Sequence, residues 1–262
     1  RTVVPAKAGY PEQSPGPRRS LPSNAFIGGG NDDLLLPGYA MLGKSIATPE
    51  LALQSSFRTM SNLPNSAAAG TGTIFTELSR FGLLRFAGSD AQKFLHSQLS
   101  CEVGALQLGQ ATYGSYNTPQ GRMLATCLLL RDARGYLIQL PRSLCAPILD
   151  RLSTYILRAQ VKAVDASDAH ALIGISGAHA EAALQSLFMS VPATALTMAA
   201  DPKAGVLRLD ARRFEVVAPT SELPGLLDAL GKHATRVAPE GWDLTDIRAG
   251  IPVITPATQD QF

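Results

Sequence analysis

The chain has 262 residues, of which 45% are hydrophobic and 17% are charged, and its formal net charge is +2. This composition is typical of a globular protein, and so small a net charge does not by itself indicate nucleic-acid binding. No apolar run approaches the ~18 residues that would predict a membrane-spanning helix.

Residues 1–70 are rich in Pro, Ser, Ala and Gly and show no hydrophobic periodicity. We predict that they are disordered or form an extension of the folded chain. Within the first twenty residues, four basic side chains face one acidic one, so a mitochondrial transit peptide is the alternative. The three cysteines are widely spaced, which favours a reducing compartment, the cytoplasm or otherwise the mitochondrial matrix, and predicts no metal site.

An internal duplication follows. The stretch Leu83–Leu99 resembles Leu172–Phe188, and Asp132–Leu152 resembles Asp210–Leu230. Each member of a pair reads as an apolar strand, a turn and an amphipathic helix. Two matches in the same order predict an α+β fold of two similar halves, residues 71–165 and 166–240, with helices covering one face of each sheet.

Inside the first half, "YNTPQGRM" (Tyr116–Met123) predicts a tight hairpin turn followed by a basic side chain. An ordinary hairpin is the simpler interpretation. Between residues 121 and 162 there are seven basic and two acidic residues. Such a stretch forms a solvated basic face, or it binds an anionic ligand or an RNA backbone.

The final stretch, residues 241–262, opens with the only tryptophan, Trp242. A single tryptophan usually belongs to the core, but the amphipathic residues beside it also allow a ring that lines a pocket. The chain contains no phosphate-binding glycine loop, no zinc-protease motif and no nucleophile elbow. The residues alone therefore indicate no catalytic group.

Three stretches carry a resemblance to a known family: "LSRFGLLRFAGSDAQKFLHSQLSCEV", "YNTPQGRMLATCLLLRD" and "WDLTDIRAGIPVITPATQDQF". In this order they resemble the YgfZ-type folate-binding proteins, relatives of the glycine-cleavage T-protein, an aminomethyltransferase. The resemblance implies a duplicated ferredoxin-like region that binds tetrahydrofolate, followed by a small C-terminal barrel. The family's Lys-Gly-Cys-Tyr-x-Gly-Gln-Glu motif would follow Phe262, so we expect this chain to be the N-terminal part.

The resemblance also implies positions for the ligand. Phe81 and Trp242 correspond to aromatic residues placed against the folate. Because a guanidinium group can bind a carboxylate with two hydrogen bonds, we expect Arg122, on the basic side of the chain, to contact the glutamate tail of the folate. Arg248 occupies the place of an acidic residue that holds the pterin in T-proteins, and Asp246 lies near it. The predicted folate-binding residues are Phe81, Trp242, Arg122, Tyr116, Asp246 and Arg248.

T-proteins carry a catalytic Asp where this chain has Ala125 or Thr126. Neither residue can act as a general base. The resemblance therefore favours a folate-dependent factor that supports the assembly or repair of iron–sulfur enzymes, including enzymes that modify tRNA, with those enzymes as partners and no membrane or direct nucleic-acid contact. A folate-dependent aminomethyltransferase is the alternative, and an RNA-binding protein ranks last because no stacking platform accompanies the basic residues.

Overall fold

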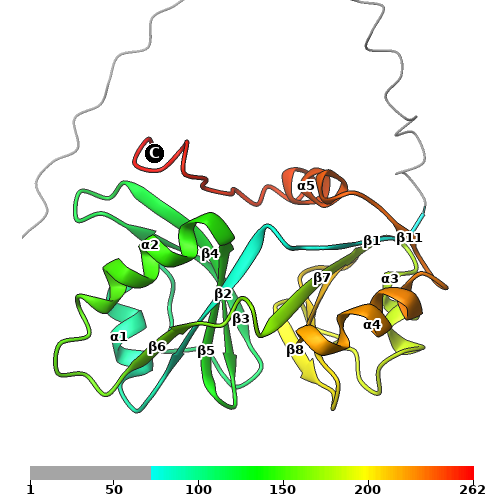
Figure 1. The fold of residues 1–262 in the computed structure, drawn as a ribbon, viewed down its shortest axis with the longest axis horizontal. Coiled ribbons are helices and arrows are strands. Elements are labelled where there is room, and N and C mark those ends of the chain that lie inside the picture. Colours follow the sequence, from blue (N-terminus) through cyan, green and yellow to red (C-terminus); the bar gives the residue numbers. More distant parts are fainter. Residues whose placement is uncertain (1–71) are drawn as a thin grey trace, which may run out of the picture. The chain divides into compact units, whose positions relative to one another are not determined.

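The computed structural model describes residues 72–262. The prediction for residues 1–70 falls outside this range. No helix within the described part of the chain is long and apolar enough to cross a membrane. The described residues contain two β-sheets, each covered on its outer face by two helices (Figure 1).

The first sheet has five strands in the order β3-β4-β5-β2-β6. Its apolar outer face packs against α1 and α2, as Leu84, Phe86 and Leu129 contact Phe94 and Leu144 in one buried cluster. The elements are β2 (Phe81–Ala87), α1 (Ala91–Gln98), β3 (Ala111–Asn117), β4 (Met123–Asp132), β5 (Gly135–Pro141), α2 (Arg142–Ser153) and β6 (Lys162–Asp165).

The second sheet has six strands in the order β11-β1-β7-β10-β9-β8. Its outer face packs against α3 and α4 around Ile173, Ile175, Phe214 and Leu230. The elements are β1 (Ile74–Glu77), β7 (His170–Ser176), α3 (Ala180–Gln185), β8 (Thr197–Ala200), β9 (Gly205–Arg208), β10 (Arg213–Pro219), the 3-10 helix η2 (Thr220–Glu222), α4 (Leu223–Leu230) and β11 (Thr235–Arg236).

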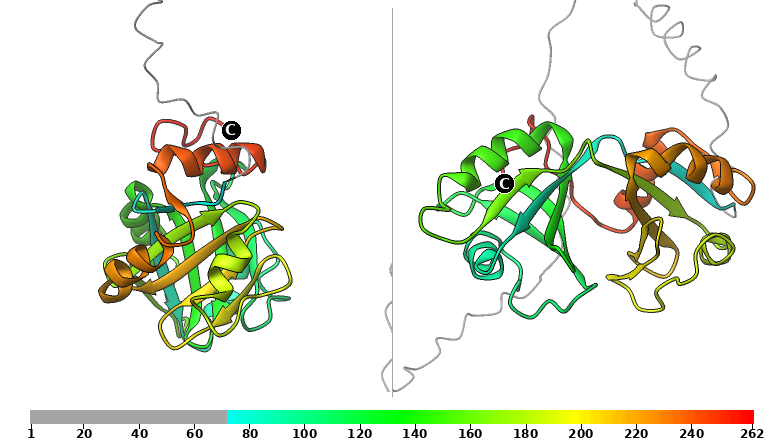
Figure 2. Two further views of the ribbon diagram at one scale, coloured as in Figure 1. Left: turned by 90° about the vertical axis from the view of Figure 1, so that its right-hand side faces the viewer. Right: turned by 60° about the horizontal axis from the view of Figure 1, so that its bottom comes forward.

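The inner faces of the two sheets meet in a third apolar cluster, which includes Leu83, Leu137, Leu172 and Leu207. At one edge the sheets also join by backbone hydrogen bonds between residues 109–111 and 196–198. The layers therefore run helices, sheet, sheet, helices, and Figure 2 shows them from two further sides. The helix α5 (Pro239–Arg248) and residues 249–262 lie across one end of both sheets (Figure 1).

The duplication predicted from the sequence is confirmed in the strand order. In the second sheet, β8-β9-β10-β7-β1 repeats the order β3-β4-β5-β2-β6 of the first. The two predicted repeat units are β2–α1 with β5–α2 and β7–α3 with β10–α4. In both halves a glycine with positive φ, Gly88 or Gly177, makes the turn from strand to helix, a conformation that glycine adopts without steric cost.

The strand β1 belongs to the sheet of the second half, although it precedes the first repeat in the sequence. β1 lies inside the range 71–165 that the sequence analysis gave to the first half, but it pairs with β7 of the second sheet. Its Phe75 is buried in the cluster of the second half. The repeated sequence begins only after this strand, so the pattern held no information about its partner. β6, at the end of the first half, occupies the equivalent place beside β2.

Candidate functional site

A cavity of about 270 Å³ lies between the inner faces of the two sheets, at the end that α5 and residues 250–253 cross. We call it the first cavity. Its walls come from β3, β4 and β5 of the first sheet, β10 of the second sheet, and α5. Successive side chains of a strand point to opposite faces of the sheet. The side chains of β5 and β10 that point towards the other sheet therefore reach the first cavity.

Two polar side chains break the apolar inner face. Gln139 of β5 and Glu215 of β10 are both buried, and Gln139 Nε2 donates a hydrogen bond of 3.2 Å to Glu215 Oε1. Glu215 Oε2 is buried and has no hydrogen-bond partner among the described residues. Burial, which disfavours the charged form, raises the pKa of Glu215 to about 7. Glu215 therefore lines the first cavity with one buried oxygen whose hydrogen-bonding capacity is unused.

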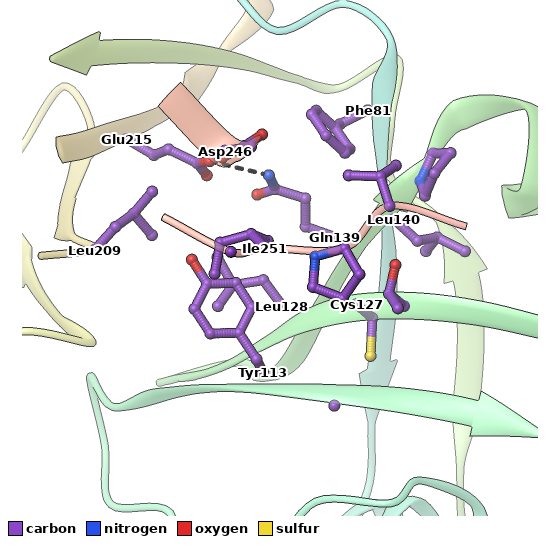
Figure 3. A pocket seen from close by; sticks show the side chains of 16 residues that line it. Phe81, Tyr113, Cys127, Leu128, Gln139, Leu140, Leu209, Glu215, Asp246 and Ile251 are labelled. Atoms are coloured by element: carbon purple, nitrogen blue, oxygen red, sulfur yellow. Dashed lines mark hydrogen bonds between the residues drawn. The ribbon is translucent and has the colours of Figure 1, made fainter. Parts of the chain in front are cut away.

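Asp246 of α5 lies beside Glu215 at the same end of the cavity (Figure 3). Its Oδ1 accepts a hydrogen bond of 2.7 Å from Arg213 Nη1, and its Oδ2 lies 3.7 Å from Arg80 Nη2. Burial raises the pKa of Asp246, and the two guanidinium groups oppose that change. Because Asp246 already has two cationic partners, Glu215 is the carboxyl group with unused hydrogen-bonding capacity.

Two aromatic rings line the first cavity, Phe81 and Tyr113. The guanidinium carbon of Arg80 lies 4.9 Å from the centre of the Phe81 ring. Burial raises the pKa of Tyr113 to about 12, so its hydroxyl group stays protonated. Together with Leu128 and Ile251, these rings offer flat apolar surface next to the carboxyl groups (Figure 3). The arrangement suits a flat heterocycle whose edge carries hydrogen-bond donors.

The C-terminal stretch is attached to the β3–β4 hairpin. The backbone N–H of Ile254 donates to Thr126 Oγ1 at 3.1 Å, and Gln259 Nε2 donates to the carbonyl oxygen of Leu124 at 2.7 Å. The backbone N–H of Met123 donates to the carbonyl oxygen of Phe262 at 2.8 Å. These bonds hold residues 250–253 over the cavity, and the Thr126 hydroxyl is used as a structural acceptor.

Of the six predicted folate-binding residues, the structure brings Phe81 and Asp246 to the first cavity. Tyr116 is buried in the helix-side cluster of the first sheet. Arg122 lies at the hairpin tip, where its Nη1 donates to the carbonyl oxygen of Asp260. Arg248 lines a different hollow on the outside of α5, next to Arg212.

Trp242 differs most from its predicted position. Only 1% of its surface is exposed, and it belongs to the apolar cluster between the sheets rather than to the cavity wall. The indole lies over Gly174, where a Cβ would come within 2.5 Å of the ring. The indole fills the space that a side chain at position 174 would occupy. Asp246, one helical turn further along α5, lines the first cavity instead.

The sequence analysis missed Tyr113, Gln139 and Glu215. A signal for two of them exists in the alternation of the strands. In "FEVVAP" a glutamate stands between Phe214 and Val216, and in "YLIQLP" a glutamine stands between Ile138 and Leu140. A charged residue inside a buried strand is rarely tolerated without a partner, so Glu215 could have been identified as a candidate.

The part of the chain covered by the structure contains no group of three or more His, Cys, Asp or Glu side chains that could hold a metal ion. Burial raises the pKa of Cys127, which also lines the first cavity, to about 12. A thiol with such a pKa is a poor nucleophile, because the thiolate is the reactive form. The groups in the first cavity that could act on a ligand are therefore the carboxyl groups of Glu215 and Asp246 and the aromatic rings of Phe81 and Tyr113.

Residues 65–200 match the GCVT N-terminal domain family. The chain belongs to this family. It is 28% identical over 201 residues to the tRNA-modifying protein YgfZ of Shigella boydii and to that of Yersinia pseudotuberculosis. Both alignments cover 76% of this chain and 61% of the relative, so the chain spans less than two thirds of the length of these curated relatives.

Among solved structures, the glycine cleavage system aminomethyltransferase T from Bartonella henselae aligns with a TM-score of 0.62 at 16% identity. The alignment covers 70% of this chain and 52% of that protein. Such a likeness shows the fold, which is that of the T-proteins. The resemblance to YgfZ-type members of the GCVT family, identified from the sequence, is confirmed.

Proposed function

We propose that the chain binds a reduced folate in the first cavity. The observation that carries the proposal is Glu215, a buried carboxyl group with one oxygen that forms no hydrogen bond with any described residue. A buried polar atom without a partner costs free energy. A ligand that donates hydrogen bonds to this carboxyl group recovers that cost.

A pterin supplies the donors. Its 2-amino group and the adjacent ring N–H form an edge with two parallel donors, and a carboxylate accepts such a pair with both oxygens. Phe81 and Tyr113 supply aromatic surface for the flat ring, where a stacked pair contributes about 0.5–1.5 kcal/mol beyond area burial. The resemblance to folate-binding proteins points to the same ligand independently of this geometry.

The test is calorimetric titration with 5-formyltetrahydrofolate, a stable reduced folate. We expect Glu215→Gln to weaken binding tenfold or more, equivalent to ~1.4 kcal/mol, because the new amide places a donor against the ligand's donors. Phe81→Leu, which removes the aromatic face, is expected to weaken binding two- to tenfold. Glu222→Gln makes the matched change outside the cavity, on η2, and should leave the affinity unchanged. Equal affinity of the Glu215 variant and the parent chain would disprove this site.

We further propose that folate binding serves the assembly or repair of iron–sulfur enzymes, with those enzymes as partners and the cytoplasm as the compartment. The YgfZ-type resemblance supports this role, as does the description of the curated relatives as tRNA-modifying proteins. The alternative, aminomethyl transfer, requires an acid or base near the reacting nitrogen. At the position of the catalytic Asp of T-proteins, Ala125 supplies no such group, and the Thr126 hydroxyl, which is not a general base, accepts the N–H of Ile254.

We therefore expect no glycine-cleavage transfer activity. The assay supplies aminomethylated carrier protein and tetrahydrofolate to the chain and follows methylenetetrahydrofolate formation. A T-protein run in parallel is the positive control. Turnover of ~1 per second or faster, an ordinary enzymatic rate, would contradict the proposal and favour the transferase.

A further inference from the structure

A second cavity, of about 550 Å³, lies between the same two sheets. It shares no lining residue with the first cavity. On β5, Gln139 faces the first cavity and Leu137 the second; on β10, Glu215 faces the first and Val217 the second. On both β5 and β10, side chains two residues apart therefore line different cavities.

The duplication relates the two cavities. Aligning Asp132–Leu152 with Asp210–Leu230 makes Gln139 equivalent to Val217, and Leu137 equivalent to Glu215. When one half is superposed on the other, Gln139 and Glu215 of the first cavity therefore fall on Val217 and Leu137 of the second. The two cavities therefore occupy equivalent positions in the duplicated fold but are lined by different side chains.

The strand registers extend this equivalence. Leu128 pairs with Gln139 in the first sheet, and Gly205 pairs with Val217 in the second. Leu128 and Gly205 are thus equivalent, and so, two positions earlier, are Thr126 and Lys203. By the same reasoning Tyr113 is equivalent to Ala200, and Phe81 to His170. All eight residues of these four pairs line their respective cavities.

The charges of the second cavity differ from those of the first. Its two carboxylates are already engaged: Asp132 accepts two hydrogen bonds from the Arg85 guanidinium, and Asp201 accepts the backbone N–H groups of Met189 and Lys203. Within residues 72–262, no carboxylate forms an ion pair with Arg134 or Lys203. Two cationic groups at the wall are therefore available to a ligand.

His170 adds a third polar group. Its Nδ1 lies 3.1 Å from the carbonyl oxygen of Ala166, which can only accept, so Nδ1 carries the hydrogen. Nε2 is then the ring nitrogen left for another partner. The remaining wall is largely apolar, with Leu137, Val217 and Met198. Apolar walls with a few convergent cationic groups suit an apolar body that bears an anionic group.

We propose that the second cavity binds a small organic anion with an apolar body, such as an aryl or acyl carboxylate or sulfonate. Arg134 and Lys203 hold the anionic group, and the space that Tyr113 fills in the first cavity is open here because Ala200 replaces it. The proposal stands independently of what the first cavity binds. No Arg, Lys or His among the described residues lines the first cavity, so that cavity offers such an anion no cationic partner at its wall.

The probe is 1-anilinonaphthalene-8-sulfonate, whose fluorescence rises on transfer to an apolar site. We expect saturable binding of one dye per chain. The double variant Arg134→Glu with Lys203→Glu should weaken binding at least tenfold. Arg151→Glu with Arg158→Glu makes the same change in net charge at exposed positions on and after α2, and should leave the affinity within about twofold of the parent value at 0.15 M salt, where distant exposed charges are screened.

A second variant tests the cavity without changing charge. Ala200→Tyr places in the second cavity the side chain that occupies the equivalent position of the first, and it should abolish dye binding. Ala200 is exposed at the cavity wall, so unchanged thermal midpoints will show that the variants fold. The proposal is overturned if the parent chain binds no dye, if the Arg151/Arg158 control weakens binding equally, or if Ala200→Tyr leaves the affinity unchanged.

Discussion

Trp242→Ala is expected to lower the free energy of unfolding by about 3–5 kcal/mol, the usual cost of removing a large aromatic side chain from a core. The indole is almost fully buried between the two sheets and lies against the backbone of Gly174. Gly174 has no side chain that could fill the cavity left by the missing indole. Urea denaturation followed by circular dichroism measures the loss.

The control is Trp242→Phe, which keeps an aromatic face over Gly174 and should recover more than half of the stability. Because Trp242 does not line the first cavity, we expect the Phe variant to bind 5-formyltetrahydrofolate as the parent chain does. A stability loss below ~1 kcal/mol for Trp242→Ala, a value typical of surface changes, would mean that the ring is not core.

Glu215→Gln is expected to make the chain more stable than its parent at pH 8 but not at pH 4. The folded-state pKa of Glu215 is raised from 4.5 to about 7, so the folded chain holds this proton more tightly than the unfolded chain does. The stability that the protonated group contributes is fully present below pH 4.5 and is lost as the pH rises through 7. At 1.36 kcal/mol per pKa unit, the loss reaches ~3 kcal/mol.

The glutamine variant lacks this titration, so the difference in unfolding free energy between variant and parent should grow by ~3 kcal/mol from pH 4 to pH 8. Denaturation curves at half-unit pH intervals measure it. Glu222→Gln, on the outer side of the second half, should follow the parent at every pH. A constant difference between the Glu215 variant and the parent would show that Glu215 titrates normally and that water reaches it.

Much of the architecture could be predicted from the sequence, because repeated strand–turn–helix patterns depend on local periodicity. Phe81 was predicted from a motif position and Asp246 only as a neighbour of the motif position that Arg248 occupies, and both line the first cavity. The contact between Gln139 and Glu215 could not be predicted in this way. It joins residues 76 positions apart and depends on how the two sheets face each other, which no local pattern specifies.

Trp242 shows the limit of a motif position. The motif predicts an aromatic ring against the ligand, whereas in the structure the ring packs on Gly174 and does not line the first cavity. Only the three-dimensional packing determines which residue of α5 faces the cavity. The sequence shows a glycine at position 174, but only the packing of α5 against β7 shows that this glycine makes room for the indole.

The exchange of β1 between the halves has a consequence for synthesis on the ribosome. β1 pairs with β7 and with β11, which begin about 100 and 160 residues later. At roughly 5–20 residues per second, β1 waits about 5–20 seconds for its first partner, with Phe75 lacking its native cover. Until β7 is synthesised, Ile74 and Phe75 of β1 therefore lack the strand that they pair with in the folded chain.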